Sequence, residues 1–91
     1  MSIKVNMSSP HLRQLTHRRE PVEVNGSTVG ECLQHLVKQF PEIEKGLFDK
    51  HGQLLNYAYL FINGKGTHPA DLGKPVKDGD ELTIGYLLAG G

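Results

Sequence analysis

The sequence has little of three things that point to particular classes of protein: cysteine, net charge and long apolar runs. Its single cysteine, Cys32, excludes a framework of intramolecular disulfides. Ten basic and ten acidic side chains give a formal net charge of zero, so bulk electrostatics attract the chain neither to nucleic acid nor to an anionic membrane. No apolar run reaches membrane-spanning length, and the first residues lack the apolar region of a signal peptide. We therefore expect a soluble, cytoplasmic protein with no nucleic-acid or membrane partner.

The length limits the chain to one domain. A chain of 91 residues can form one compact domain and is too short for two. A domain of this size buries about two thirds of its unfolded surface at most, which leaves no room for a deep active site of its own. We expect a single domain over residues 1–91 with one modest core.

Two alternating segments near the start of the chain predict strands. Residues 3–7 and 21–26 alternate apolar and polar side chains, the pattern of a half-buried strand, and the second run stops at Asn25-Gly26. The polar residues 8–19 contain Pro10 and are predicted to form a loop. That loop is too long for a tight hairpin, but antiparallel pairing of the two strands is the simplest arrangement.

A helix is predicted after these strands. Ser27 or Thr28 supplies an N-cap, and Glu31 stands where a capping box needs an acidic residue. One apolar stripe at helical spacing follows, made of Val29, Leu33, Leu36, Val37 and Phe40. Pro41 ends this helix because proline disfavours the helical conformation of the residue before it. Residues 42–48 are expected to add a short second helical turn.

The second half of the chain predicts two more strands. Residues 57–62 have the strongest strand composition. The expected helix-facing residues of this strand are Ala58, Leu60 and Ile62, and those on the opposite face are Tyr57, Tyr59 and Phe61. Turns at residues 63–66 and 77–80 precede a last strand that begins at 81–84, with Leu82 and Ile84 inward and Thr83 and Gly85 outward. These elements fit an α+β fold with one helix on one sheet.

The chain closes on Ala89-Gly90-Gly91. Without Cβ atoms, Gly90 and Gly91 allow another protein's backbone or a narrow channel to approach closely. Residues 87–91 could extend roughly 16 Å. The alternative is that small terminal residues simply fray.

Together these features resemble the ubiquitin-like β-grasp sulfur carriers of the MoaD/ThiS group. The segments that carry the resemblance are 24–31, 60–64, 77–82 and the terminal Ala89-Gly90-Gly91. Residues 8–19 and 47–57 look closest to the carriers of the cysteine pathway. The chain departs from the group at Tyr86, since members commonly have proline shortly before the terminal glycines.

The resemblance implies a mixed sheet of four to five strands covered by one main helix, with residues 87–91 as a flexible reactive tail. It implies that Gly91, next to Gly90, is adenylated by a ubiquitin-activating-type adenylyltransferase that uses ATP and Mg. The carboxylate then becomes a thiocarboxylate, which a sulfur-accepting biosynthetic enzyme consumes. The sulfur-containing metabolite made in this way would be cysteine or homocysteine, molybdopterin or the thiamine thiazole, in that order of preference. The chain would be a carrier and not an enzyme, with no bound cofactor, and a monomer when free.

Two aromatic side chains on the outer face of the predicted sheet suggest where a partner binds. Large exposed rings often mark an interface, although they also serve to cover a sheet against a loop. Tyr59 and Phe61 are expected to lie near the start of the tail. The predicted partner-binding residues are Tyr59, Phe61, Tyr86, Leu87, Leu88 and Ala89.

Other patterns point to no further site. The five histidines lack the spacing of metal ligands, so no metal is expected. Cys32 is expected to be buried in the helix. Two functions compete with the sulfur carrier: a ubiquitin-like modifier joined to other proteins through Gly91, and a plain interaction domain whose tail is incidental. Gly91 is either the encoded terminus or one exposed by a protease.

Overall fold

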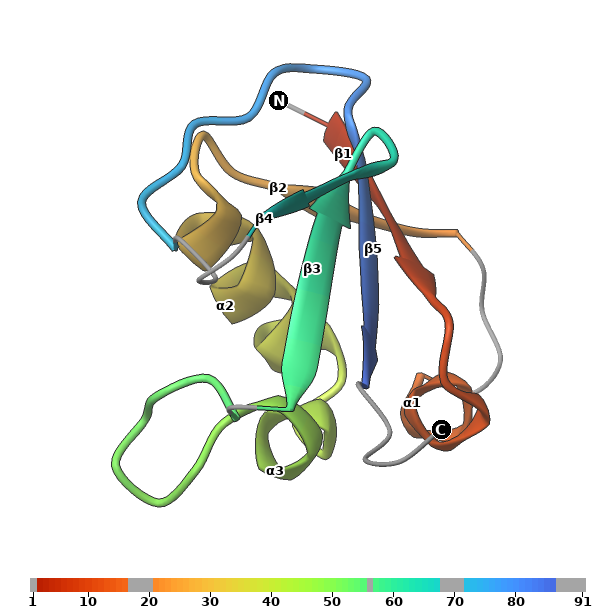
Figure 1. The fold of residues 1–91 in the computed structure, drawn as a ribbon, viewed down its shortest axis with the longest axis vertical. Helices are drawn as coiled ribbons and strands as arrows, with labels where there is room; N and C mark the ends of the chain where they lie inside the picture. Colours follow the sequence, from red (N-terminus) through yellow and green to blue (C-terminus); the bar gives the residue numbers. More distant parts are fainter. Residues whose placement is uncertain (1, 17–20, 56, 68–71, 87–91) are drawn as a thin grey trace.

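The computed structural model describes residues 2–16, 21–55, 57–67 and 72–86. Eight helices and strands occur within those residues (Figure 1). They are β1 Ser2–Met7, α1 Pro10–Leu15, β2 Val22–Asn25, α2 Val29–Gln39, α3 Ile43–Leu47, β3 Ala58–Ile62, β4 Lys65–Thr67 and β5 Glu81–Tyr86. Among the described residues, no helix is both long and apolar enough to cross a membrane.

The strands form one mixed five-stranded sheet in the order β2-β1-β5-β3-β4. β1 and β2 pair antiparallel, with Ile3 opposite Val24, as predicted. β1 and β5 pair parallel in the middle of the sheet, with Val5 opposite Leu82. The first and last strands are therefore neighbours, and β3 lies on the other side of β5. This is the β-grasp arrangement that the resemblance implied.

Helix α2 begins and ends where its sequence predicts. The hydroxyl of Thr28 accepts a hydrogen bond from the backbone N–H of Glu31 at 3.2 Å, so Thr28 is the N-cap. The carboxylate of Glu31 accepts bonds from the backbone N–H and the hydroxyl of Ser27, both at 2.8 Å. These bonds from Ser27 lower the pKa of Glu31. At the other end, Phe40 is the C-cap and Pro41 follows it.

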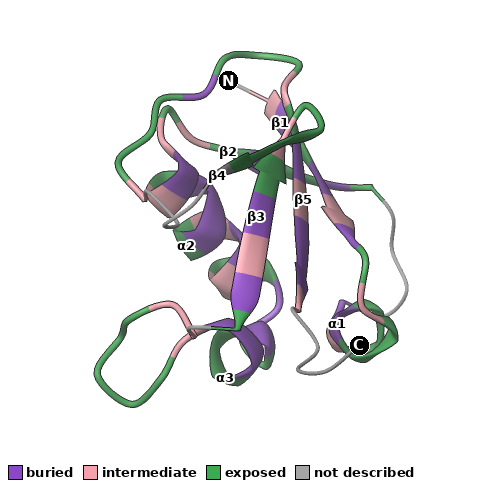
Figure 2. Cartoon of the chain, viewed as in Figure 1, coloured by how far each residue is buried: buried purple, intermediate pink, exposed green. Residues whose placement is uncertain are grey.

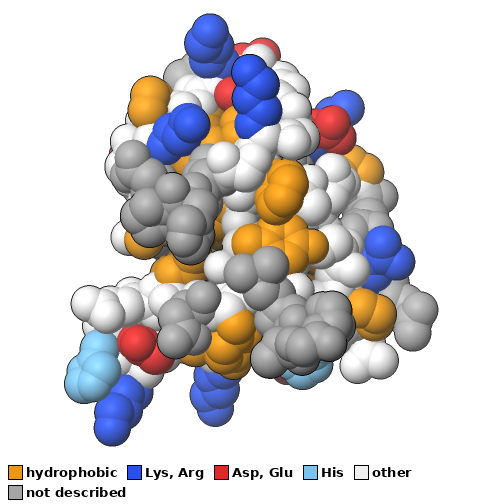
Figure 3. Space-filling model, viewed as in Figure 1, with side chains coloured by type: hydrophobic (Ala, Val, Ile, Leu, Met, Phe, Trp, Pro, Cys, Tyr) orange, Lys and Arg blue, Asp and Glu red, His pale blue; other side chains and the backbone are white. Residues whose placement is uncertain are grey.

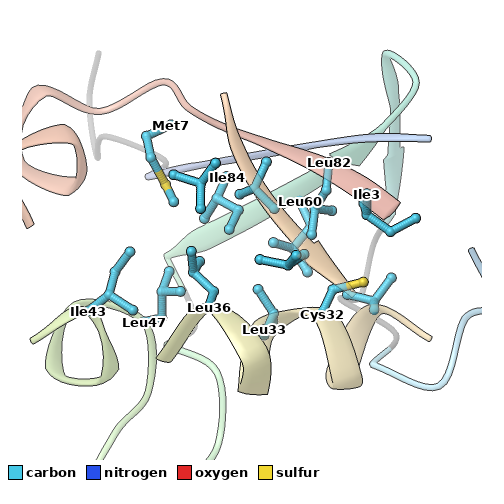
Figure 4. Close-up of a cluster of buried hydrophobic side chains, with 14 of the residues drawn as sticks. Ile3, Met7, Cys32, Leu33, Leu36, Ile43, Leu47, Leu60, Leu82 and Ile84 are labelled. Carbon is cyan, nitrogen blue, oxygen red and sulfur yellow. The ribbon is translucent and has the colours of Figure 1, made fainter. Parts of the chain in front are cut away.

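The core lies between the sheet and the helices (Figures 2 and 4). Figure 4 shows side chains of the strands pointing toward those of α2 and α3. The largest wholly buried side chains are Ile3, Met7, Leu12, Leu33, Leu36, Ile43, Leu47, Leu60, Leu82, Ile84, Val5 and Val24. The predicted alternation of β3 and β5 is confirmed on this side, because Leu60, Leu82 and Ile84 have no exposed surface.

The predicted loop over residues 8–19 was wrong in part, because α1 lies within it. Pro10 is the first residue of this helix, a position that needs no backbone N–H and suits the fixed φ of proline. Leu12 is wholly buried in the core and Leu15 packs against it. The apolar contact therefore stabilises six residues whose composition reads as a loop. The short α3, in contrast, was predicted.

The predicted turn over residues 63–66 is shorter than expected. Asn63 and Gly64 have positive φ values of 52° and 84°, which suits a two-residue hairpin connection. β4 begins directly afterwards at Lys65 and pairs with β3, so Phe61 lies opposite Gly66. Three residues of strand are too few to give a sequence pattern.

The turn at residues 77–80 connects three parts of the sheet. Asp80 accepts hydrogen bonds from the Asn63 side chain at 3.0 Å and from the backbone N–H of Lys77 at 2.8 Å. These bonds lower the pKa of Asp80, with that from Asn63 contributing most. Asp78 accepts a bond from the backbone N–H of Ser2 at 2.7 Å. Asp78 and Asp80 therefore both have structural partners, and their hydrogen bonds link the start of β1, the β3–β4 turn and the start of β5.

Candidate functional site

The outer face of the sheet, opposite the core, carries two aromatic rings. Tyr59 and Phe61 alternate with the buried residues of β3 and project from this face, which we call the open face. Their ring centroids lie 5.1 Å apart at an interplanar angle of 72°, an edge-to-face pair. Phe61 is 37% exposed. Figure 3 shows hydrophobic side chains at the surface around β3 and β5.

Gly85 of β5 positions the Tyr59 ring. A Cβ atom at Gly85 would lie 2.5 Å from two atoms of Tyr59 and 2.0 Å from the hydroxyl of Ser8. Because glycine has no side chain, the Tyr59 ring lies across β5, and its hydroxyl is 2.7 Å from that of Ser8. Gly85 is therefore buried although it faces outward as predicted. This role was not predicted from the sequence. The signal that could have revealed it is a glycine inside a strand, which often marks a place where another group lies close to the backbone.

Phe61 is held from the other side by β4. Its ring lies over Gly66, where a Cβ atom would be 3.7 Å from the ring. Here too an aromatic ring covers a glycine on the neighbouring strand. The two glycines and the edge-to-face pair fix both rings without burying Phe61. The open face thus presents an ordered apolar patch that an apolar surface of another protein can cover.

The open face is polar on the β1 side. Residues Lys4, Asn6 and Ser8 alternate with the buried residues of β1. Asn6 donates a hydrogen bond to the carboxylate of Glu81 at 3.2 Å. The apolar patch of Tyr59 and Phe61 is thus bordered by polar groups, the usual layout of a protein-binding surface.

Tyr86 lies on the other side of the sheet from the two rings. It is half-buried against the core, and its hydroxyl donates a hydrogen bond to the backbone carbonyl of Gly46 in α3. Its ring centroid is 5.4 Å from that of Tyr57 and 6.4 Å from that of His11. Burial, followed by the proximity of Tyr57, raises the pKa of Tyr86. Tyr86 therefore fixes the end of β5 to α3.

The structure brings two of the predicted partner-binding residues together. Tyr59 and Phe61 form one patch, whereas Tyr86 lies on the side of the helices. Leu87, Leu88 and Ala89 lie outside the described residues, as do the predicted reactive residues Gly90 and Gly91. The role of all these residues in partner binding or sulfur transfer stays a prediction.

The cysteine and the histidines provide no second site in the part of the chain that the structure describes. Cys32 has no exposed surface, and burial raises the pKa of its thiol. His35 does not pair with it: Nδ1 of His35 accepts a hydrogen bond from the backbone N–H of Asn25 at 2.7 Å. No group of three or more potential metal ligands occurs among the described residues.

Comparison with known proteins places the chain in a family. The model of the ThiS family matches residues 10–91. The chain belongs to the ThiS family. Its relatives are ubiquitin-like small modifiers and sulfur carriers, and the MoaD/ThiS resemblance is confirmed.

Two relatives are similar over most of the chain. Small archaeal modifier protein 1 of Haloferax volcanii is 35% identical over 71 residues, which cover 77% of this chain and 78% of that protein. Its crystal structure superposes with a TM-score of 0.85 at 28% identity, with 100% of both chains covered. A chain of the Amycolatopsis orientalis BexX/CysO complex gives a TM-score of 0.83 at 29% identity, with 98% of this chain and 99% of that chain covered. A relative of this protein thus occurs in a complex with another protein.

Proposed function

We propose that this ThiS-family chain is a sulfur carrier whose Gly91 carboxylate becomes a thiocarboxylate. The observation that carries the proposal is the ordered, exposed patch of Tyr59 and Phe61 beside β5, the strand that leads into Gly90-Gly91. An activating enzyme that covers this patch holds the end of β5 next to its own active site. The family membership supports the chemistry, and the patch supports the way in which a partner recognises the chain.

The proposed chemistry needs only a carboxylate from this chain. A ubiquitin-activating-type adenylyltransferase binds ATP and Mg, and the Gly91 carboxylate attacks the α-phosphate, which releases pyrophosphate and forms an acyl adenylate. Sulfur at the oxidation level of sulfide then displaces AMP. The resulting thiocarboxylate is anionic and polarisable, hence a good nucleophile at neutral pH. On a sulfur-accepting biosynthetic enzyme, the sulfur forms a bond to the acceptor, and water then hydrolyses the acyl–sulfur bond, which regenerates the carboxylate and leaves the sulfur on the acceptor. The partners supply every acid and base.

The described residues support a role as carrier and not as catalyst. Cys32 is buried and its thiol has a raised pKa, so it is a poor nucleophile. The exposed patch is apolar, which suits protein binding better than acid–base chemistry. For the sulfur-containing product, we propose cysteine or homocysteine first, then molybdopterin and the thiamine thiazole. This order follows the resemblance of residues 8–19 and 47–57 to the cysteine-pathway carriers.

A second candidate function is protein modification. The relative that is 35% identical is named a small archaeal modifier protein, which favours this alternative. The chemistry is shared as far as the adenylate. In a modifier, a lysine amine of a target would then displace AMP and form an isopeptide bond with Gly91.

Intact-mass measurement of the purified full chain tests the proposal. After incubation with ATP, Mg, a sulfide source and the activating enzyme, we expect a mass increase equal to the difference between sulfur and oxygen. A chain that lacks Gly91 serves as the control and should not change. Attachment to other proteins without any thiocarboxylate would favour the modifier. Failure to form either adenylate or thiocarboxylate would sink the carrier and leave an interaction domain, which should still function after deletion of Gly90 and Gly91.

A further inference from the structure

A groove lies between α1 and α3, on the helix side of the sheet. It has a volume of about 450 Å³ and is lined by His11, Leu15, Pro41, Glu42, Lys45 and Gly46. Both helices lie at the end of the sheet where β5 stops (Figure 1). The groove is therefore at the same end of the molecule as the point from which the tail departs.

Tyr86 connects the end of β5 to this groove directly. Its hydroxyl donates to the carbonyl of Gly46, which lines the groove, and its ring is 6.4 Å from that of His11, another lining residue. A Cβ atom at Gly46 would lie 3.2 Å from the Tyr86 hydroxyl and 3.0 Å from a methyl carbon of Leu15. Glycine at position 46 thus leaves room for Leu15 and the Tyr86 hydroxyl, so the last described residue reaches the wall of the groove.

Leu88 is the apolar residue two positions beyond Tyr86. Side chains of an extended chain alternate between the two faces, so a tail that continued the course of β5 would direct residue 88 to the same side as Tyr86 and residue 87 to the opposite side. Two extended residues reach about 7 Å beyond Tyr86. A leucine side chain fits a groove of this volume, and half-buried Leu15 offers it an apolar contact.

We propose that the groove between α1 and α3 holds the side chain of Leu88 of the same molecule. The docked residue keeps the tail against the helix side, whereas a partner on the patch of Tyr59 and Phe61 approaches from the open face. Leu88 must then leave the groove before Gly91 enters an active site. If roughly nine molecules in ten hold Leu88, a partner that needs the free tail has its apparent Kd raised about tenfold. This consequence rests on the proposed function, but the docking does not.

Solution NMR of the full-length chain tests the docking without any partner. We expect nuclear Overhauser cross-peaks from the methyl groups of Leu88 to Leu15 or to the His11 ring. Leu87 should give no such cross-peaks because it projects to the other side. A tail in which Leu88 shows no contact with these residues, or in which Leu87 and Leu88 show the same contacts, would overturn the proposal.

Matched tail variants complete the test. Leu88→Ser should abolish these cross-peaks and shift the amide signals of Leu15 and Gly46, whereas Leu87→Ser should leave those signals in place. Neither substitution replaces a residue of the buried core, so we expect both variants to fold. A mixture of labelled and unlabelled chains distinguishes Leu88 of the same molecule from Leu88 of a second copy. If cross-peaks occur only between different molecules, a second copy fills the groove and the proposal fails. Because no thiocarboxylate is involved, these results stand apart from the mass measurement.

Discussion

Leu60 and Phe61 are neighbours on β3, yet they project from opposite faces of the sheet and differ in burial. Leu60 has no exposed surface, whereas Phe61 keeps 37% of its surface exposed. Folding explains Leu60, because α2 and the inner faces of the strands cover it. Folding does not explain Phe61, since the outward positions of β1 show that this sheet accepts polar residues such as Lys4 and Asn6 on the same face. This exposure is the reason why we propose that the outer aromatic residues contact a second protein.

The largest effect on stability is expected inside the covered face. Leu60→Ala should lower the free energy of unfolding by about 3 kcal/mol, because it removes a wholly buried side chain and leaves a cavity. Phe61→Ala is the larger truncation but should cost only about 1 kcal/mol, mainly from the edge-to-face pair with Tyr59. Urea unfolding of both variants measures the contrast. A greater loss for Phe61→Ala would mean that Phe61 belongs to the core.

The next effect concerns the support of the open face. Gly85→Ala should lower the free energy of unfolding by about 2 kcal/mol, since the new Cβ collides with Tyr59 and Ser8. The same substitution in a Tyr59→Ala background should cost less, because one of the colliding groups is gone. Thermal or urea unfolding of the four proteins gives the coupling energy. Equal costs in the two backgrounds would show that the contact with Tyr59 does not determine the effect.

Phe61→Asp should change binding strongly and stability little. We expect affinity for the activating enzyme to fall by about tenfold or more, as for a hot-spot residue. The unfolding curve should stay within about 1 kcal/mol of the parent, because the residue is already exposed. Asn25→Asp adds the same charge on the polar side of the open face and serves as the control. Unchanged affinity of Phe61→Asp, measured by calorimetry, would show that the patch of Tyr59 and Phe61 does not bind the activating enzyme.

The smallest effect is expected from two carboxylates, Glu31 in the first turn of α2 and Asp80 just before β5. Glu31 and Asp80 both have a lower pKa in the folded chain than their ordinary values of 4.5 and 3.8. Their charged forms therefore stabilise the fold above those values, and this stabilisation is lost as the pH falls through the folded pKa. Urea unfolding at neutral pH and below pH 3.8 should show a decline that is shallower in Asp80→Asn. An identical decline in the parent and in Asp80→Asn would argue against a contribution from Asp80.

The sequence predicted what depends on local pattern. Alternation in β3 placed Tyr59 and Phe61 outward, and the helix signals placed α2 between Thr28 and Pro41. The short elements α1 and β4 were missed, because each is stabilised by contacts with distant residues. The burial of Leu12 in the common core is one such contact.

Pairings between distant residues could not be read from the sequence. The contact of Ser8 and Tyr59 joins residues 51 positions apart, and the bond from Tyr86 to Gly46 joins residues 40 positions apart. Both contacts depend on how the helices and strands pack together, and the sequence does not predict all of these elements. Alternation alone gives the face of Tyr86, but it cannot give the partner that fixes it. The positioning role of Gly85 was hidden for the same reason.

The central place of β5 has a mechanical consequence. β5 is hydrogen-bonded along one edge to β1 and along the other to β3, and Tyr86 ties its end to α3. A force that pulls on the chain beyond Tyr86 acts along the strand and across both sets of hydrogen bonds, which are perpendicular to the strand in the antiparallel pair with β3 and slanted in the parallel pair with β1. The two ladders then bear the load in shear, with many bonds strained together. An enzyme that draws in the tail thus pulls against the most firmly held strand of the sheet and does not peel the domain open.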